Sequence, residues 1–70
     1  MPLSEFCLHY DINQHYDRLA KLEYEPGDKG IVGLGREEWQ GFAGFSKLAW
    51  DKVLEKHKQF CKDVRDGVWA

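Results

Sequence analysis

The spacing of apolar residues along the chain predicts helices. Near the N-terminus, Leu3, Phe6, Cys7 and Tyr10 recur at the i, i+3, i+4, i+7 intervals that place side chains on one helix face. Strand signals are poor, because Thr is absent and no Asn-Gly or Asp-Gly dipeptide separates two alternating apolar runs. The expected fold class is therefore all-α.

Two short helices are expected first, over residues 4–10 and residues 14–22. Ser4 and Asn13 are their expected N-caps, because a short polar side chain can accept a hydrogen bond from a free backbone N–H at a helix start. The apolar stripe of the second helix consists of Tyr16, Leu19, Ala20 and Leu22, and the apolar Ile12 precedes its expected cap.

Glycine and proline separate the next segments. Pro26 and Gly27 predict a turn over residues 25–28. A short apolar turn over residues 31–34 follows, and then a short helix that starts at residue 36 and that Gly41 and Gly44 should end.

The last segment has the clearest pattern. Ser46 is its expected N-cap, a helical period persists over residues 47–65, and Gly67 is a suitable C-terminal stop. The apolar positions are Ala49, Trp50, Val53, Leu54, His57, Phe60, Cys61 and Val64. The prediction is a single domain over residues 1–70, with a helical core over about residues 3–65, in which four short helices precede one long C-terminal helix.

This layout resembles a sterile alpha motif (SAM) domain, a compact five-helix interaction module, over about residues 3–60. Residues 6–12 and 16–24 resemble its first two helices. The core pattern is matched by Ile31-Val32-x-Leu34-x-x-Glu37-Glu38-Trp39. The entry to the last helix is matched by Ala43-Gly44-Phe45-x-x-Leu48-Ala49-x-x-x-Val53-Leu54.

The resemblance implies a protein–protein interaction module, in which an acidic middle surface meets the start of the last helix of another domain. Partners would be a second copy or another helical domain. The acidic surface would comprise Glu23, Glu25, Asp28, Glu37 and Glu38, with Trp39 at its edge. The last-helix surface would comprise Lys47, Trp50 and Lys52.

Charge and composition agree with a small interaction domain. Residues 1–46 hold eight acidic and four basic residues, a formal charge of −4, whereas residues 47–70 hold six basic and four acidic residues, a charge of +2. Complementary patches on one body allow head-to-tail association. The chain has only 70 residues, 14% of them aromatic, and such a chain typically retains about 3–5 kcal/mol of net stability. This size disfavours a two-domain enzyme, and the composition disfavours a membrane span.

Catalytic, metal and cofactor chemistry is not expected. Both serines are assigned as helix caps, and the three histidines have no recognisable nucleophile spacing. A zinc set of Cys7, His9, His57 and Cys61 is conceivable, but Cys7 and His9 point about 200° apart on a helix. The cysteines are expected to be reduced and to meet between the first and last helices. No signal peptide opens the sequence, so an intracellular location is expected.

Two alternatives remain open. A small helical nucleic-acid-binding protein would use Lys56, Lys58 and Lys62, or Arg18 and Lys21, against phosphates. An accessory or inhibitor protein would dock as a monomer on a larger partner. Trp69 is expected either to fold the C-terminal tail onto the domain or to lie in a disordered end.

Overall fold

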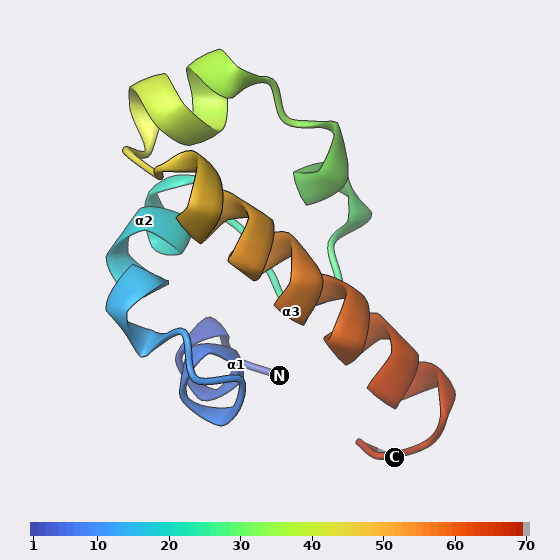
Figure 1. The fold of residues 1–70 in the computed structure, drawn as a ribbon. Coiled ribbons are helices and arrows are strands. Elements are labelled where there is room, and N and C mark those ends of the chain that lie inside the picture. Colours follow the sequence, from blue (N-terminus) through green and yellow to red (C-terminus); the bar gives the residue numbers. More distant parts are fainter. Residues whose placement is uncertain (70) are drawn as a thin grey trace.

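The computed structural model describes residues 1–69, and within them it contains helical segments and no β-strand (Figure 1). The all-α prediction is therefore confirmed for this part of the chain. The elements in chain order are α1 (Leu3–His9), the 3₁₀ segment η1 (Asn13–His15), α2 (Tyr16–Lys21), the 3₁₀ segment η2 (Lys29–Gly33), the π-helical segment η3 (Glu37–Phe42) and α3 (Lys47–Arg65). In Figure 1 the long α3 runs diagonally across the domain, with α1 and α2 to its left and the green segments above it.

Both ends of α3 follow from local sequence. The Ser46 hydroxyl accepts a hydrogen bond from the Ala49 N–H at 3.2 Å, which confirms the predicted N-cap. At the other end Gly67 has a φ of +82°, its N–H donates to the Val64 carbonyl at 3.2 Å, and the Val68 N–H donates to the Asp63 carbonyl at 2.9 Å. This pair of bonds is a Schellman motif, the helix end that glycine favours.

The N-caps predicted for the first two helices are wrong. Ser4 lies inside α1, which begins after Pro2, and Asn13 is the first residue of η1. Neither side chain caps a helix. The backbone alone starts α1, since the Phe6 N–H donates to the Pro2 carbonyl at 3.1 Å.

Helices α1 and α2 end in the same way as α3 but without glycine. Asp11 and Glu23 follow them with φ angles of +60° and +58°. The next residue donates its N–H back across five residues in each case, from Ile12 to the Cys7 carbonyl at 2.9 Å and from Tyr24 to the Leu19 carbonyl at 3.1 Å. Ile12 and Tyr24 are both buried, so core packing holds their predecessors in the left-handed region.

The glycine-rich middle of the chain partly matches expectation. The predicted turn over residues 25–28 is confirmed by a 2.9 Å hydrogen bond from the Asp28 N–H to the Glu25 carbonyl. Gly41 does not end its helix, because η3 continues through it to Phe42. Gly44, with a φ of +86°, makes the break that leads into α3.

An aromatic cluster forms the middle of the core. The Phe6 ring contacts Tyr10, Tyr24 and Phe60, with centroids 5.1–5.7 Å apart. Two members of the predicted α2 stripe, Tyr16 and Ala20, are exposed instead. The other buried apolar residues are Cys7, Ile12, Leu19, Ile31, Trp39, Ala43, Phe45, Trp50 and Val53.

Trp69 anchors the end of the described chain. Its indole Nε1 donates a hydrogen bond to the Tyr10 hydroxyl at 3.1 Å, and this hydroxyl donates to the Asp63 carboxylate at 2.6 Å. The Tyr10 hydrogen bond holds the pKa of Asp63 below its usual range. The first of the two expectations for Trp69, a packing anchor, is therefore the one that the structure shows.

Candidate functional site

The five carboxylates of the predicted acidic surface are all exposed. They are distributed over the end of α2, the following turn and the first turn of η3. Among residues 1–69, ion pairs join Lys47 to Asp51 and Lys62 to Asp66, and neither involves these five acids. Glu23, Glu25, Asp28, Glu37 and Glu38 therefore present negative charge to solvent.

The two tryptophans proposed for these surfaces lie in the core. Trp39 is 8% exposed and Trp50 is 4% exposed. Their rings stack at a centroid distance of 5.5 Å and an interplanar angle of 5°, and Phe45 packs against Trp50 at 5.1 Å. The stacked pair attaches η3 to the first turn of α3. The prediction that these indoles lie at contact surfaces is corrected, because a small domain needs its largest apolar rings to build the core.

The start of α3 presents a mixed surface rather than a purely basic one. The Lys47 ammonium donates to the Asp51 carboxylate at 3.0 Å, an exposed pair that places an acid beside this cation. Lys52 is exposed and makes no ion pair within the described residues. The sequence analysis expected Lys47 and Lys52 on this surface, and the structure places both there.

Leu48 is the residue that the sequence analysis missed at this surface. Its side chain is 84% exposed, the largest exposed fraction among the exposed large apolar residues. Leu48 lies two residues before the buried Trp50, so it points about 200° away around the helix. A large apolar residue out of phase with the buried stripe is the signal that could have identified it.

Phe42 is a second exposed apolar side chain, at the opposite end of the loop that leads into α3. It is 56% exposed, and the Lys21 ammonium lies 5.0 Å from its ring centroid. Arg18 is also engaged, since its guanidinium lies 6.0 Å from the Phe45 ring centroid. The two cations of α2 that the sequence analysis considered for phosphate binding therefore contact aromatic rings.

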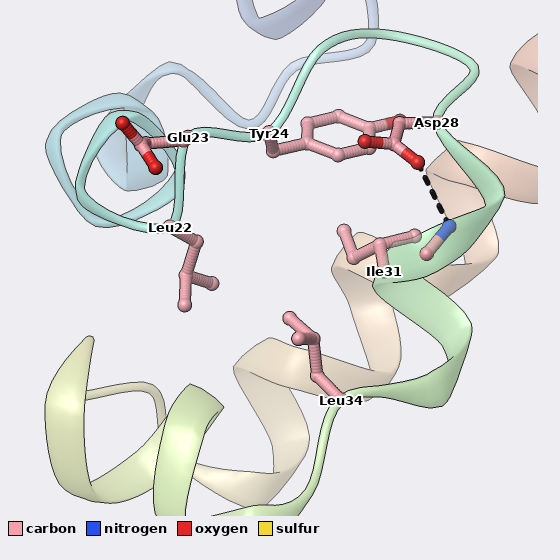
Figure 2. Close-up of a pocket in the computed structure, with 7 residues that line it drawn as sticks. Leu22, Glu23, Tyr24, Asp28, Ile31 and Leu34 are labelled. Carbon is pink, nitrogen blue, oxygen red and sulfur yellow. Dashed lines mark hydrogen bonds between the residues drawn. The ribbon is translucent and has the colours of Figure 1, made fainter.

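An apolar recess with an acidic rim lies between the end of α2 and η2. Figure 2 shows Leu22, Ile31 and Leu34 pointing toward one another, while the carboxylates of Glu23 and Asp28 lie above them, on either side of Tyr24. Its volume is about 170 Å³. The Gly30 N–H donates to Asp28 Oδ1 at 2.9 Å, which fixes this carboxylate at the start of η2.

Tyr24 forms the back of the recess and leads to a buried polar network. Its hydroxyl accepts the Gly27 N–H at 3.3 Å and shares a hydrogen bond of 2.9 Å with His57 Nδ1. Burial raises the pKa of Tyr24 to about 12 and lowers the pKa of His57. Both groups are therefore neutral near pH 7, which is the state that a buried, hydrogen-bonded pair favours.

The conceivable zinc set does not form in the structure. Cys61 Sγ lies 3.7 Å from His57 Nε2, but no group of three His, Cys, Asp or Glu side chains among residues 1–69 could hold a metal ion. Both cysteines are free, and burial raises the pKa of the Cys7 thiol.

Comparison with known proteins adds no family. No family model matches the chain, and no curated protein or solved structure matches it. Within residues 1–69, none of the helices combines the length and apolar character needed to cross a membrane.

Proposed function

We propose that the protein is a non-enzymatic interaction module that associates head to tail with copies of itself. In this proposal Leu48 of one copy enters the acidic-rimmed recess of the next copy. Lys52, one helical turn from Leu48, then faces the carboxylates of Glu23 and Asp28. One observation carries the proposal. The surface of the domain has an exposed leucine, Leu48, beside a cation, and it also has an apolar recess beside two carboxylates.

Size supports this pairing. A protein cavity of about 150 Å³ lined by apolar side chains can hold a benzene molecule. A recess of about 170 Å³ is therefore large enough for one branched aliphatic side chain. Burial of Leu48 would contribute roughly 1.5–3 kcal/mol to each contact, which suits a weak, reversible association.

Charge supports the same orientation. The recess has two carboxylates without ion pairs among the described residues, and Lys52 is a cation without one. Complementary charges speed encounter and select the orientation of docking, and salt weakens them. Leu48 is not among the residues that line the recess, so each copy has one projecting and one receiving surface. When these two surfaces join head to tail, the contact is heterologous and gives open chains or rings, whereas a reciprocal contact between two copies would give a closed dimer.

The proposal includes a SAM-like fold. Its support is the order of segments: α1, the continuous η1–α2 unit, η2 and η3 precede one long helix, α3. A partner helical domain with the same two surfaces would fit this chain equally well. His57 is buried against Tyr24 and Ser46 caps α3, so these two side chains have structural roles.

The test is molar mass as a function of concentration, by light scattering on a sizing column at low and moderate salt. We expect the mass of the natural chain to rise with concentration and to fall with added salt. Leu48→Asp and Glu23→Lys should each remain monomeric. The matched control is Leu8→Asp, because Leu8 is also highly exposed, at 72%, but lies on α1.

Mixing the two defective variants gives the sharpest result. Leu48→Asp keeps an intact recess, and Glu23→Lys keeps an intact Leu48, so together they should form a one-to-one complex and stop there. Circular dichroism checks that each variant keeps its helical content. Unchanged assembly of Leu48→Asp, or an equal loss in Leu8→Asp, would show that the proposed contact is wrong.

A further inference from the structure

A second concave surface lies between η2 and α3, and none of its residues belongs to the acidic-rimmed recess. It is a groove of about 490 Å³ lined by Lys29, Val32, His57, Lys58, Cys61, Lys62 and Arg65. Four of these seven side chains are cationic and none is acidic. In a chain with a formal net charge of −2, this is a local concentration of positive charge.

The cations of the groove come from two walls. Lys58, Lys62 and Arg65 are at positions i, i+4 and i+7 of α3 and so lie on one helix face. Lys29 belongs to η2 on the other side of the groove. Figure 1 shows η2 above the middle of α3, and the groove lies between η2 and residues 57–65 of α3. A ligand in the groove would therefore meet positive charge from both sides.

Asp63 and Asp66, the acids on either side of the groove's Arg65 on α3, leave most of its charge available. Asp66 pairs with Lys62 at 2.8 Å, but both side chains are about half exposed, and such a pair contributes little and exchanges readily. Asp63 accepts hydrogen bonds from Tyr10 and Gln59 instead. Within the described residues, Lys29, Lys58 and Arg65 make no ion pair.

We propose that this groove binds the phosphodiester backbone of single-stranded nucleic acid. The row from residue 58 to residue 65 spans about 10 Å at a rise of about 1.5 Å per residue. A single strand that runs along this row would also meet Lys29 on the opposite wall of the groove.

The uncharged part of the groove is small and contains no aromatic ring. It consists of Val32, which is 57% exposed, with His57 and Cys61. His57 is buried and holds Tyr24 through Nδ1. No Phe, Tyr or Trp ring lines the groove, so it offers no aromatic platform on which a base could stack. Recognition therefore rests on phosphates.

Salt dependence gives the expected magnitude. For single strands the logarithm of the binding constant falls with the logarithm of salt concentration, with a slope of about −0.7 for each phosphate neutralised. Four contacts predict a slope of roughly −2.8, and the loss of one cation should reduce its size by about 0.7. If binding of the two proteins is equal at 1 M salt, the loss of one contact weakens binding roughly eightfold at about 50 mM salt.

The experiment is a titration of a short fluorescent oligothymidine with the protein, followed by anisotropy at several salt concentrations. Lys58→Gln and Arg65→Gln should each show the smaller slope. Lys47→Gln is the matched control, because it removes the same charge from the same helix outside the groove. Leu48→Asp should bind like the natural chain, which separates this site from the proposed self-association.

Cys61 provides a direct report of where the strand lies. It lines the groove, whereas Cys7 is fully buried and serves as the internal control. A neutral alkylating reagent should modify Cys61 more slowly when the oligothymidine is bound. Protection that is lost in Lys58→Gln would support the proposal further.

Several results would overturn it. One is no anisotropy change at low salt, and another is an equal loss of affinity in Lys47→Gln and Lys58→Gln. Binding that leaves Cys61 unprotected would place the strand elsewhere. Equal affinity for duplex DNA, or equal competition by polyglutamate, would contradict recognition of a single phosphodiester strand.

Discussion

Removal of one hydroxyl tests whether the buried polar network stabilises this fold. The Tyr24 hydroxyl is bonded to His57 Nδ1 at 2.9 Å and to the Gly27 N–H at 3.3 Å. Tyr24→Phe keeps the ring against Phe6 but leaves His57 Nδ1 without its partner. Tyr24 is 5% exposed and His57 is 3% exposed, so water cannot easily replace the lost hydroxyl.

The expected loss of unfolding free energy is about 1–3 kcal/mol, the usual cost of leaving one buried polar group unsatisfied. A domain of this size has about 3–5 kcal/mol in total. The substitution should therefore remove a large share of the stability. Each kcal/mol corresponds to a fall in Tm of roughly 4–8 °C for a domain of this length.

Urea unfolding near pH 7.5, followed by tryptophan fluorescence and circular dichroism, measures this loss. The urea midpoint should fall while the dependence of free energy on urea stays the same. Tyr16→Phe is the matched control, because Tyr16 is exposed and its hydroxyl makes no hydrogen bond within the described residues. Its unfolding free energy should stay within about 0.5 kcal/mol of the natural chain.

A double substitution checks the reasoning behind the magnitude. In Tyr24→Phe with His57→Leu, no buried polar atom of the pair is left without a partner, so the combined loss should be smaller than the sum of the two single losses. Simple additivity would refute the argument. So would a Tyr24→Phe variant as stable as Tyr16→Phe.

Two further predictions concern stability. Asp11→Gly should raise the unfolding free energy by about 0.5–1 kcal/mol, because Asp11 has a φ of +60° that glycine adopts without strain. The control, Ala20→Gly inside α2, should lower the unfolding free energy. A urea midpoint of Asp11→Gly at or below that of the natural chain would contradict the prediction. Stability should also fall as pH drops below about 6.5, because burial holds the folded-state pKa of His57 and His15 below the ordinary value. The unfolded chain binds these protons first, so the urea midpoint should be lower at about pH 5.5 than at about pH 7.5, and a flat or rising midpoint would show that these histidines are not titrating as described.

Local sequence determined the most regular parts of this protein. The extent of α3, its Ser46 cap and its Gly67 ending were predictable because each depends on residues within one or two helical turns. The turn over residues 25–28 follows equally from its own Pro26 and Gly27. The apolar period of residues 47–65 also predicted most of the buried face of α3, although Val64 is exposed.

Tertiary packing decided the features that local rules missed. Asp11 and Glu23 are left-handed because Ile12 and Tyr24, the residues after them, are buried. The first two helices therefore end where their following residue reaches the core, which no local capping rule could indicate.

The candidate sites divide in the same way. Exposure of the five acidic residues and of Lys47 and Lys52 is what charge alone suggests. The burial of Trp39 against Trp50, the recess beside Glu23 and the groove that joins Lys29 to α3 are contacts between segments distant in sequence. Such contacts depend on how helices fit together in space, and the apolar period of one helix contains no information about its neighbours.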